Sequence, residues 1–182
     1  VKTSPNNLHV CYCYTPMRYI WDQFDPYFKS EGAGAITSAV MGLLRPGLRR
    51  WDVRTSQTVN QFVAISKHVK KRIQKFYGRD AVVIYPPVDT KFYSPSRESP
   101  GDYFLMVSAF APYKRLDLAV EAFGKLGYPL KIIGEGQEFK RLKNTAASNI
   151  EFLGWLPDEK VRSFYARCRA LVFPGEEDFG IV

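Results

Sequence analysis

Two short polar stretches follow apolar runs in the second half of the chain, and their residue types suit a phosphorylated sugar. Lys114 and Arg115 stand between an expected strand and an expected helix, where cations and a helix N-terminus favour a diphosphate. The acidic run Glu176–Asp178 follows the apolar run Ala170–Phe173, and its carboxylates can accept hydrogen bonds from sugar hydroxyls. Gly180 lets backbone amides approach a phosphate. Taken alone, each stretch is also typical of a structural turn.

An alternation of strands and helices must position these residues. Apolar runs predict strands at 103–108, 130–133, 150–153 and 170–173, alternating with helices at 116–126, 139–144 and 158–167. Ligands of open α/β sheets bind outside the carboxyl ends of the strands, which is where Lys114 and Glu177 fall. Gly134 and Gly136 allow a tight turn after the second strand, although a lone pair of glycines is a weak signal.

The first half shows the same alternation. We expect strands at 8–14, 61–65 and 81–85, and a helix at 67–77 that Ser66 caps and Gly78 ends. Helical spacing also covers 35–59, where Pro46 and Gly47 predict a kink or a division into two helices. The order of elements is that of a doubly wound half-domain. A proline-rich passage without periodicity at 89–101 then reads as a linker between domains at 1–88 and 102–182.

Composition narrows the class of protein. The chain has 182 residues, 46% of them hydrophobic, and no apolar run near the ~18 residues of a membrane span. Residues 1–7 lack the apolar core of a secretory signal, so we expect a cytoplasmic protein. Three cysteines without a CxxC pair and two distant histidines indicate neither a disulfide framework nor a zinc site.

The positive charge is concentrated in the first half. Residues 1–90 hold 13 Lys and Arg against 6 Asp and Glu, a net charge of +7, whereas residues 91–182 carry +1. Arg45, Arg49 and Arg50 lie among apolar residues such as Leu43 and Trp51, which is typical of a helix that binds an anionic membrane surface. A solvated helix face is the alternative. The pattern of aromatic and basic residues does not match nucleic-acid-binding modules, so no nucleic acid partner is expected.

The order of four strand ends is more specific than any one of them. Lys114-Arg115, Gly134-Glu135-Gly136, Phe152–Asp158 and Glu177–Gly180 together resemble the nucleotide-binding domain of the retaining glycosyltransferase family 4. That family has the GT-B fold, an α/β fold of two facing Rossmann-like domains. In the first half, the stretches Cys11–Asp22, Ile65-Ser66 and Tyr85–Asp89 resemble a bacterial mannosyltransferase-like branch acting in O-antigen or exopolysaccharide assembly. The resemblance covers essentially the whole chain.

The resemblance implies roles for individual residues. Glu177 would be the first glutamate of the family's E-x7-E motif, beside the donor sugar, and Lys114 would contact the donor diphosphate with Arg115 close by. Tyr14 stands where close relatives commonly have a histidine that touches the donor sugar. The remaining donor-binding residues, largely acting through backbone groups, would be Gly134, Gly136, Gly154, Leu156, Asp158, Phe179, Gly180 and Ile181.

The implied activity is transfer of a hexose, with retention, from a nucleoside diphosphate sugar to a saccharide or lipid-linked acceptor in cell-surface polysaccharide synthesis. GDP-mannose is the first choice of donor and UDP-sugars are the next. Two cations and backbone amides would stabilise the leaving diphosphate, so neither a metal nor a cofactor is expected. The acceptor would be met at the inner face of the membrane, with the protein bound peripherally.

Three departures from the family pattern qualify this expectation. The second glutamate of E-x7-E would fall three residues beyond Val182, and early strands of the first domain are lacking, so the chain reads as an internal fragment with both domains incomplete. Ser108–Phe110 lacks the arginine that relatives often have there. We therefore expect the fragment alone to be inactive. The alternatives are a non-catalytic nucleotide-sugar-binding module and, less favoured, a nucleic-acid-binding α/β protein.

Overall fold

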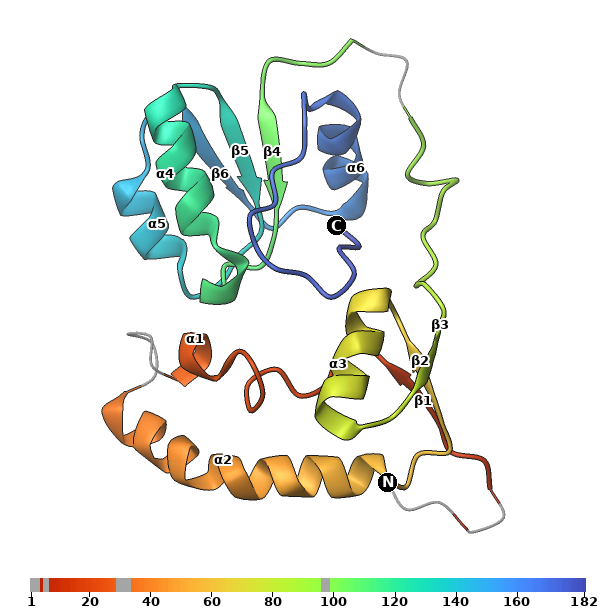
Figure 1. Ribbon diagram of the computed structural model, residues 1–182. Coiled ribbons are helices and arrows are strands. Elements are labelled where there is room, and N and C mark those ends of the chain that lie inside the picture. The colour runs from red at the N-terminus through yellow and green to blue at the C-terminus, as the bar shows by residue number, and fades with distance from the viewer. Residues whose placement is uncertain (1–3, 5–6, 29–33, 96–98) are drawn as a thin grey trace. The chain divides into compact units, whose positions relative to one another are not determined.

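The computed structural model describes residues 4, 7–28, 34–95 and 99–182, which form two compact α/β units (Figure 1). The first unit comprises residues 1–87 and takes in the segment Glu177–Ile181, and the second comprises Val88–Glu176 with Val182. The chain passes from the first unit to the second between Pro87 and Val88, and the segment around Glu177 groups with the first unit. Part of the expected linker, residues 96–98, lies outside the described residues.

The first unit is built on a parallel sheet of three strands in the order β1 (Val10–Cys13), β2 (Gln61–Ala64) and β3 (Ala81–Val83). The crossover helix α3 spans Lys67–Tyr77, as predicted. The hydroxyl oxygen of Ser66 accepts from the Val69 amide at 3.0 Å, and Gly78 ends the helix in the left-handed conformation. Its buried residues Val69 and Ile73 pack on the sheet with Phe62 and Ala64.

Helix α2 (Ala35–Ser56) is continuous, so the division into two helices that Pro46 allowed is wrong. A single proline removes one backbone hydrogen bond, and contacts on its C-terminal side hold the helix on the unit. The carboxylate of Asp52 accepts hydrogen bonds from the Trp21 indole at 2.8 Å and from the Tyr77 hydroxyl at 2.9 Å. A short helix that the sequence analysis did not foresee, α1 (Phe24–Phe28), precedes α2.

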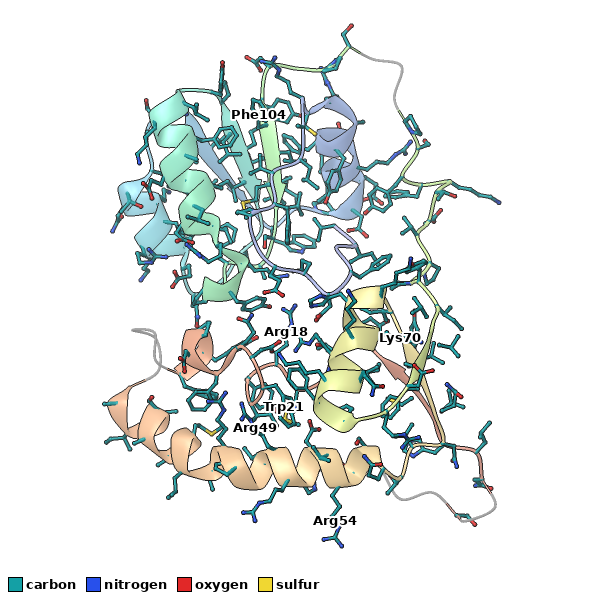
Figure 2. The ribbon with its side chains drawn as sticks, in the orientation of Figure 1. Arg18, Trp21, Arg49, Arg54, Lys70 and Phe104 are labelled. Carbon is teal, nitrogen blue, oxygen red and sulfur yellow. The ribbon has the colours of Figure 1, made fainter. Side chains whose placement is uncertain are left out.

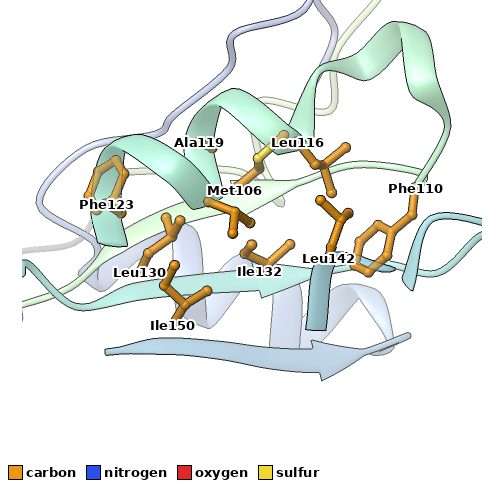
Figure 3. Close-up of a cluster of buried hydrophobic side chains, with 10 residues drawn as sticks. Met106, Phe110, Leu116, Ala119, Phe123, Leu130, Ile132, Leu142 and Ile150 are labelled. Atoms are coloured by element: carbon orange, nitrogen blue, oxygen red, sulfur yellow. The ribbon is translucent and has the colours of Figure 1, made fainter. Parts of the chain in front are cut away.

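The second unit repeats the pattern with a parallel sheet in the order β4 (Phe104–Val107), β5 (Leu130–Ile133) and β6 (Ile150–Gly154). Helices α4 (Leu116–Leu126) and α5 (Phe139–Thr145) pack on one face, and α6 (Asp158–Arg167) packs on the other. This arrangement confirms the predicted alternation. Figure 3 shows the main core, to which each fully buried Leu or Ile contributes about 1.5–3 kcal/mol. Its buried members are Met106, Phe110, Leu116, Ala119, Val120, Phe123, Leu130, Ile132, Leu142 and Ile150.

The strand expected at 170–173 is reduced to a single parallel bridge between Leu105 and Leu171. The Leu105 amide donates to the Ala170 carbonyl at 3.0 Å, and the Val172 amide donates to the Leu105 carbonyl at 2.7 Å. Pro174 has no amide hydrogen to donate, so the ladder cannot continue beyond this point. The prediction of a fourth strand is therefore wrong, although the segment does lie along β4.

The described part of the linker packs on α6 of the second unit. The guanidinium of Arg162 lies 5.2 Å from the centre of the Phe92 ring, and the rings of Tyr93 and Tyr165 meet edge to face at 6.1 Å. Through these contacts, Phe92 and Tyr93 of the linker are packed against the second unit. Among the described residues, no helix is both long and apolar enough to cross a bilayer.

Candidate functional site

A single turn of 3-10 helix, η1 (Pro112–Lys114), follows β4 and presents the two predicted cations. Arg115 ends this turn with φ 54°, and it is the one non-glycine residue with positive φ in the described part of the chain. This conformation costs about 1 kcal/mol, and such strain is typical of functional sites. Its guanidinium donates to Asp117 at 3.0–3.3 Å, which lowers the pKa of that carboxyl. The charge of Arg115 is therefore already balanced within its own loop.

Lys114 lies beside the segment that leads into the acidic run. Its ammonium is 5.2 Å from the centre of the Tyr113 ring and 5.6 Å from that of Phe173. The backbone of Gly175 is packed against the backbone of Lys114, where a Cβ at position 175 would lie 2.9 Å from the Lys114 carbonyl oxygen. The structure thus brings together Lys114 and the residues immediately before Glu176, although 60 residues separate them in the sequence.

Gly134 and Gly136 hold the turn after β5 against the loop after β4. A Cβ on Gly134 would lie 1.9 Å from the Ser108 carbonyl oxygen, and one on Gly136 would lie 2.7 Å from that of Phe110. Both have positive φ, at 131° and 152°. The Phe110 amide donates to the Glu135 carbonyl at 2.8 Å, which ties the two loops together. These glycines have a packing function, and their contact with a donor stays a prediction.

The donor-binding residues predicted at 154–158 lie at the end of β6 and directly after it. Gly154, the last residue of β6, has φ 71° and accepts a hydrogen bond from the Gly134 amide at 2.8 Å, which ties the turn after β5 to the end of β6. Leu156 packs against the core beneath α6, while Asp158 is exposed at the first turn of that helix. Trp155, which lies within this predicted stretch, exposes 68% of its surface.

The segment Glu177–Ile181 lies in the first unit, where Asp178 is held by two arginines that the sequence analysis did not identify. Asp178 Oδ1 accepts a hydrogen bond from Arg72 at 3.0 Å, and Oδ2 lies 2.9 Å from Arg18 Nε. Phe179 stacks on Tyr85, with ring centres 5.8 Å apart. Glu177 is half-buried beside this anchored residue, and Gly180, with φ 77°, and Ile181 are exposed.

Tyr14 follows β1, also at the carboxyl end of a strand, and 63% of it is exposed. Its ring meets that of Tyr12 edge to face at 5.5 Å, and the Tyr12 hydroxyl donates to the Ile84 carbonyl at 3.1 Å. The structure therefore places Tyr14 at the strand end where a ligand is expected. Its contact with a donor sugar stays a prediction.

Two of the three arginines predicted to face a membrane instead bind the loop after β1. Arg45 and Arg49 both donate to the carbonyls of Ile20 and Trp21, over distances of 2.7–2.9 Å. The guanidinium of Arg49 also lies 4.9 Å from the centre of the Trp21 ring (Figure 2). Burial lowers the pKa of Arg49 from its ordinary value. Arg50 remains exposed.

The comparison with protein families decides the class of protein. The model of the family described as glycosyl transferases group 1 matches residues 89–182, just over half of the chain. The chain belongs to this family. Lys114, both glycine turns and the acidic run all lie within the matched region of this glycosyl transferase.

Curated relatives agree with the family. The chain is 30% identical over 128 residues to an uncharacterized glycosyltransferase of Methanocaldococcus jannaschii, covering 68% of this chain and 36% of that protein. It is 36% identical over 93 residues to the O-antigen chain mannosyltransferase C of Escherichia coli, covering 47% of this chain and 25% of that protein. The chain thus spans about a third or less of the length of these relatives.

Solved structures show the same fold. TarM of S. aureus, solved as a mutant with fondaparinux, alpha-GlcNAc-glycerol and UDP, matches 85% of this chain with a TM-score of 0.61 at 14% identity, over 31% of its own length. Anabaena HepE, solved with UDP and glucose, matches 70% of this chain with a TM-score of 0.59 at 16% identity, over 41% of its own length. The predicted α/β fold of GT-B type is therefore confirmed.

Proposed function

We propose that this glycosyl transferase moves a hexose from a nucleoside diphosphate sugar to a saccharide or lipid-linked acceptor, with retention, in cell-surface polysaccharide synthesis. The observation that carries the proposal is the packing of Gly175 against Lys114 in the second unit. It places a cation beside the residue that precedes Glu176 in the same unit, and a cation and a carboxylate both suit a phosphorylated sugar.

Lys114 is the residue we propose to hold the donor diphosphate. It acts as a point charge shortly after the carboxyl end of β4. When the glycosidic bond breaks, negative charge develops on the leaving diphosphate, and this cation stabilises it. Because Arg115 already pairs with Asp117, we assign it a supporting part in this step.

Glu177 is the residue we propose to bind hydroxyls of the donor sugar, with amides of Phe179, Gly180 and Ile181 beside it. For retention, we propose attack by the acceptor on the same face as the departing diphosphate, whose oxygen takes the acceptor proton. No protein nucleophile enters this scheme. No group of three or more His, Cys, Asp or Glu that could hold a metal occurs among the described residues, and independence from metals stays a prediction.

GDP-mannose is the donor we propose first, because a relative at 36% identity is named an O-antigen chain mannosyltransferase. UDP-sugars are the second choice, since Anabaena HepE binds UDP and glucose on the same fold. Titration calorimetry with GDP, UDP, GDP-mannose and UDP-glucose separates the two. The K114A variant should weaken nucleoside diphosphate binding about tenfold or more.

The matched control for K114A is K125A, because Lys125 is an exposed lysine of α4 that pairs with Glu121. K125A should bind the nucleotides as the wild type does. Equal affinities of wild type and K114A for all four nucleotides would contradict the proposed part of Lys114. Binding without sugar transfer would instead favour the non-catalytic module.

We further propose that the acceptor is met at an anionic membrane surface through α2. Leu43 and Trp51 expose 83% and 55% of their surfaces, and Arg50 and Arg54 are exposed on the same helix, where Arg54 points outward (Figure 2). The double variant R50E/R54E should lose flotation with vesicles containing anionic lipid. Arg45 and Arg49 are unsuitable for this test because their substitution would release Ile20 and Trp21. Unchanged flotation would contradict the proposal.

A further inference from the structure

Asp178, in the acidic run, is held by contacts with residues of the first unit. Only 11% of its side chain is exposed, and each of its carboxylate oxygens faces a different guanidinium. Arg72 Nη1 donates to Oδ1 at 3.0 Å, and Arg18 Nε lies 2.9 Å from Oδ2. A hydrogen-bonded guanidinium from α3 and an ion pair with the loop after β1 therefore hold the two oxygens of the carboxylate.

The main chain of Asp178 is fixed as well. The Ser66 hydroxyl donates to the Asp178 carbonyl, and the same hydroxyl oxygen accepts from the Val69 amide at the start of α3. One residue further on, Phe179 stacks on Tyr85 and packs against the core of the first unit. Asp178 is thus held through its side chain, its carbonyl and its neighbour.

The charges around Asp178 are balanced. Arg72 also donates to Asp22 at 2.8 Å, so two guanidinium groups meet two carboxylates. His68 lies 3.8 Å from Asp178 Oδ1 on the outer side of the cluster, and 43% of its side chain is exposed. Replacing buried ion pairs by apolar residues often stabilises a protein, so stability alone does not explain the use of four charges to hold this segment.

We propose that Asp178 is a positioning residue whose clamping by Arg18 and Arg72 fixes the adjacent Glu177 and the amides of Phe179–Ile181 for binding the donor sugar. This inference rests on the proposed function, in which Glu177 contacts sugar hydroxyls. A peptide bond joins Glu177 to a residue held at both carboxylate and carbonyl, which restricts where the main chain of Glu177 can lie. The chain passes from the second unit to the first at the same bond, between Glu176 and Glu177.

The proposal predicts a selective loss of sugar recognition. In D178N one carboxylate oxygen is replaced by an amide NH2 group, which cannot accept a hydrogen bond from the arginine that faces it, and the negative charge is lost. The segment is therefore held less firmly. Affinity for GDP-mannose should fall about tenfold relative to GDP, while affinity for GDP itself should stay at the wild-type value. UDP-glucose and UDP provide the same comparison if the base is uracil. D178E, which keeps the charge, should restore part of the preference.

D22N is the matched control, because it removes the other carboxylate that Arg72 binds without touching the segment itself. It should retain the wild-type preference for the sugar nucleotide. Equal weakening of GDP and GDP-mannose binding in D178N, or an unchanged preference, would overturn the proposal. If D178N does not fold, Y85A serves in its place, because Tyr85 is 54% exposed and stacks on the anchored Phe179. Y85A should then show the same selective loss, and a wild-type preference would overturn the proposal.

Hydrogen exchange separates this inference from the proposed function. The amides of Phe179, Gly180 and Ile181 should exchange faster in D178N than in the wild type without any nucleotide present, and D22N should leave them unchanged. If these amides exchange faster in D178N but the wild type binds no sugar nucleotide more tightly than the corresponding diphosphate, the clamp is supported and the proposed function is overturned. Unchanged exchange would overturn the clamp itself.

Discussion

Gly175 and Lys114 are in backbone contact, such that a Cβ at position 175 would lie 2.9 Å from the Lys114 carbonyl oxygen and 3.1 Å from its Cα. Backbone atoms cannot yield as the end of a flexible side chain can. The contact therefore couples the position of the proposed diphosphate-binding cation to the chain that leads into Glu177.

The first prediction follows from this contact. G175A should displace Lys114 and weaken nucleoside diphosphate binding about tenfold, as measured by titration calorimetry. Adding K114A to G175A should cause little further loss, because both changes act on the same cation. G124A is the control, since its new Cβ would lie in ordinary contact, 3.7 Å from that of Ala147. Full and independent losses in the double variant would contradict the coupling.

The left-handed conformation of Arg115 gives a second prediction. R115G and R115A both lose the pair with Asp117, but only the alanine variant retains the strain at φ 54°. The glycine variant should therefore be the more stable by about 1 kcal/mol in urea unfolding. An alanine variant as stable as the glycine variant would show that the loop relaxes to another conformation.

Asp52 is predicted to be a major stabilising residue of the first unit. D52A leaves the Trp21 indole and the Tyr77 hydroxyl without their acceptor in a buried position, and should reduce the free energy of unfolding by about 3 kcal/mol. D52N keeps one oxygen acceptor and should cost less. D80A removes an exposed carboxylate whose surface pair with Lys70 contributes little, so it should change thermal unfolding far less than D52A does, which makes it the control.

Alkaline pH should destabilise the first unit. Burial, with smaller effects of Cys11 and Asp178, raises the pKa of the Cys13 thiol to about 12. An unfolded cysteine ionises near ~8.5, so between that pH and about 12 the unfolded state binds fewer protons than the folded state. The free energy of unfolding should then fall as pH rises, by at most about 1.4 kcal/mol per pH unit from this thiol. C13A should reduce that slope in urea unfolding measured at several pH values, and an unchanged slope would exclude Cys13 as its source.

The sequence predicted those elements whose ends carry local signals. Helix α3 has the cap Ser66 and the terminator Gly78, and α4 ends at Gly127 in the left-handed conformation, so both helices were predicted with the correct limits. The prediction of a fourth strand in the second unit was wrong because an apolar run does not show how many hydrogen bonds a strand can form before Pro174 ends the ladder. Helix α1 has five residues and contains Pro26, which gives it no recognisable period.

The candidate site was predicted less completely, for a physical reason. Lys114 follows β4, and the acidic run follows the apolar segment that bridges to β4, which the alternation of apolar runs indicates. The partners of Asp178 are not visible in this way, because Arg72 lies on a helix 106 residues earlier and nothing in its local pattern indicates a distant carboxylate. The grouping of Glu177–Ile181 with the first unit depends on that pairing and could not be predicted either.

The ion pairing of Asp178 also has a consequence for synthesis on the ribosome. Asp178, one of the two carboxylate partners of Arg72, is translated 106 residues later, after the whole sheet of the second unit. The first unit can assemble its strands and helices early, but its charge network closes only once the chain through Asp178 has emerged. At ~5–20 residues per second, this delay is on the order of 5–20 seconds, so the last step of folding of the first unit awaits the second.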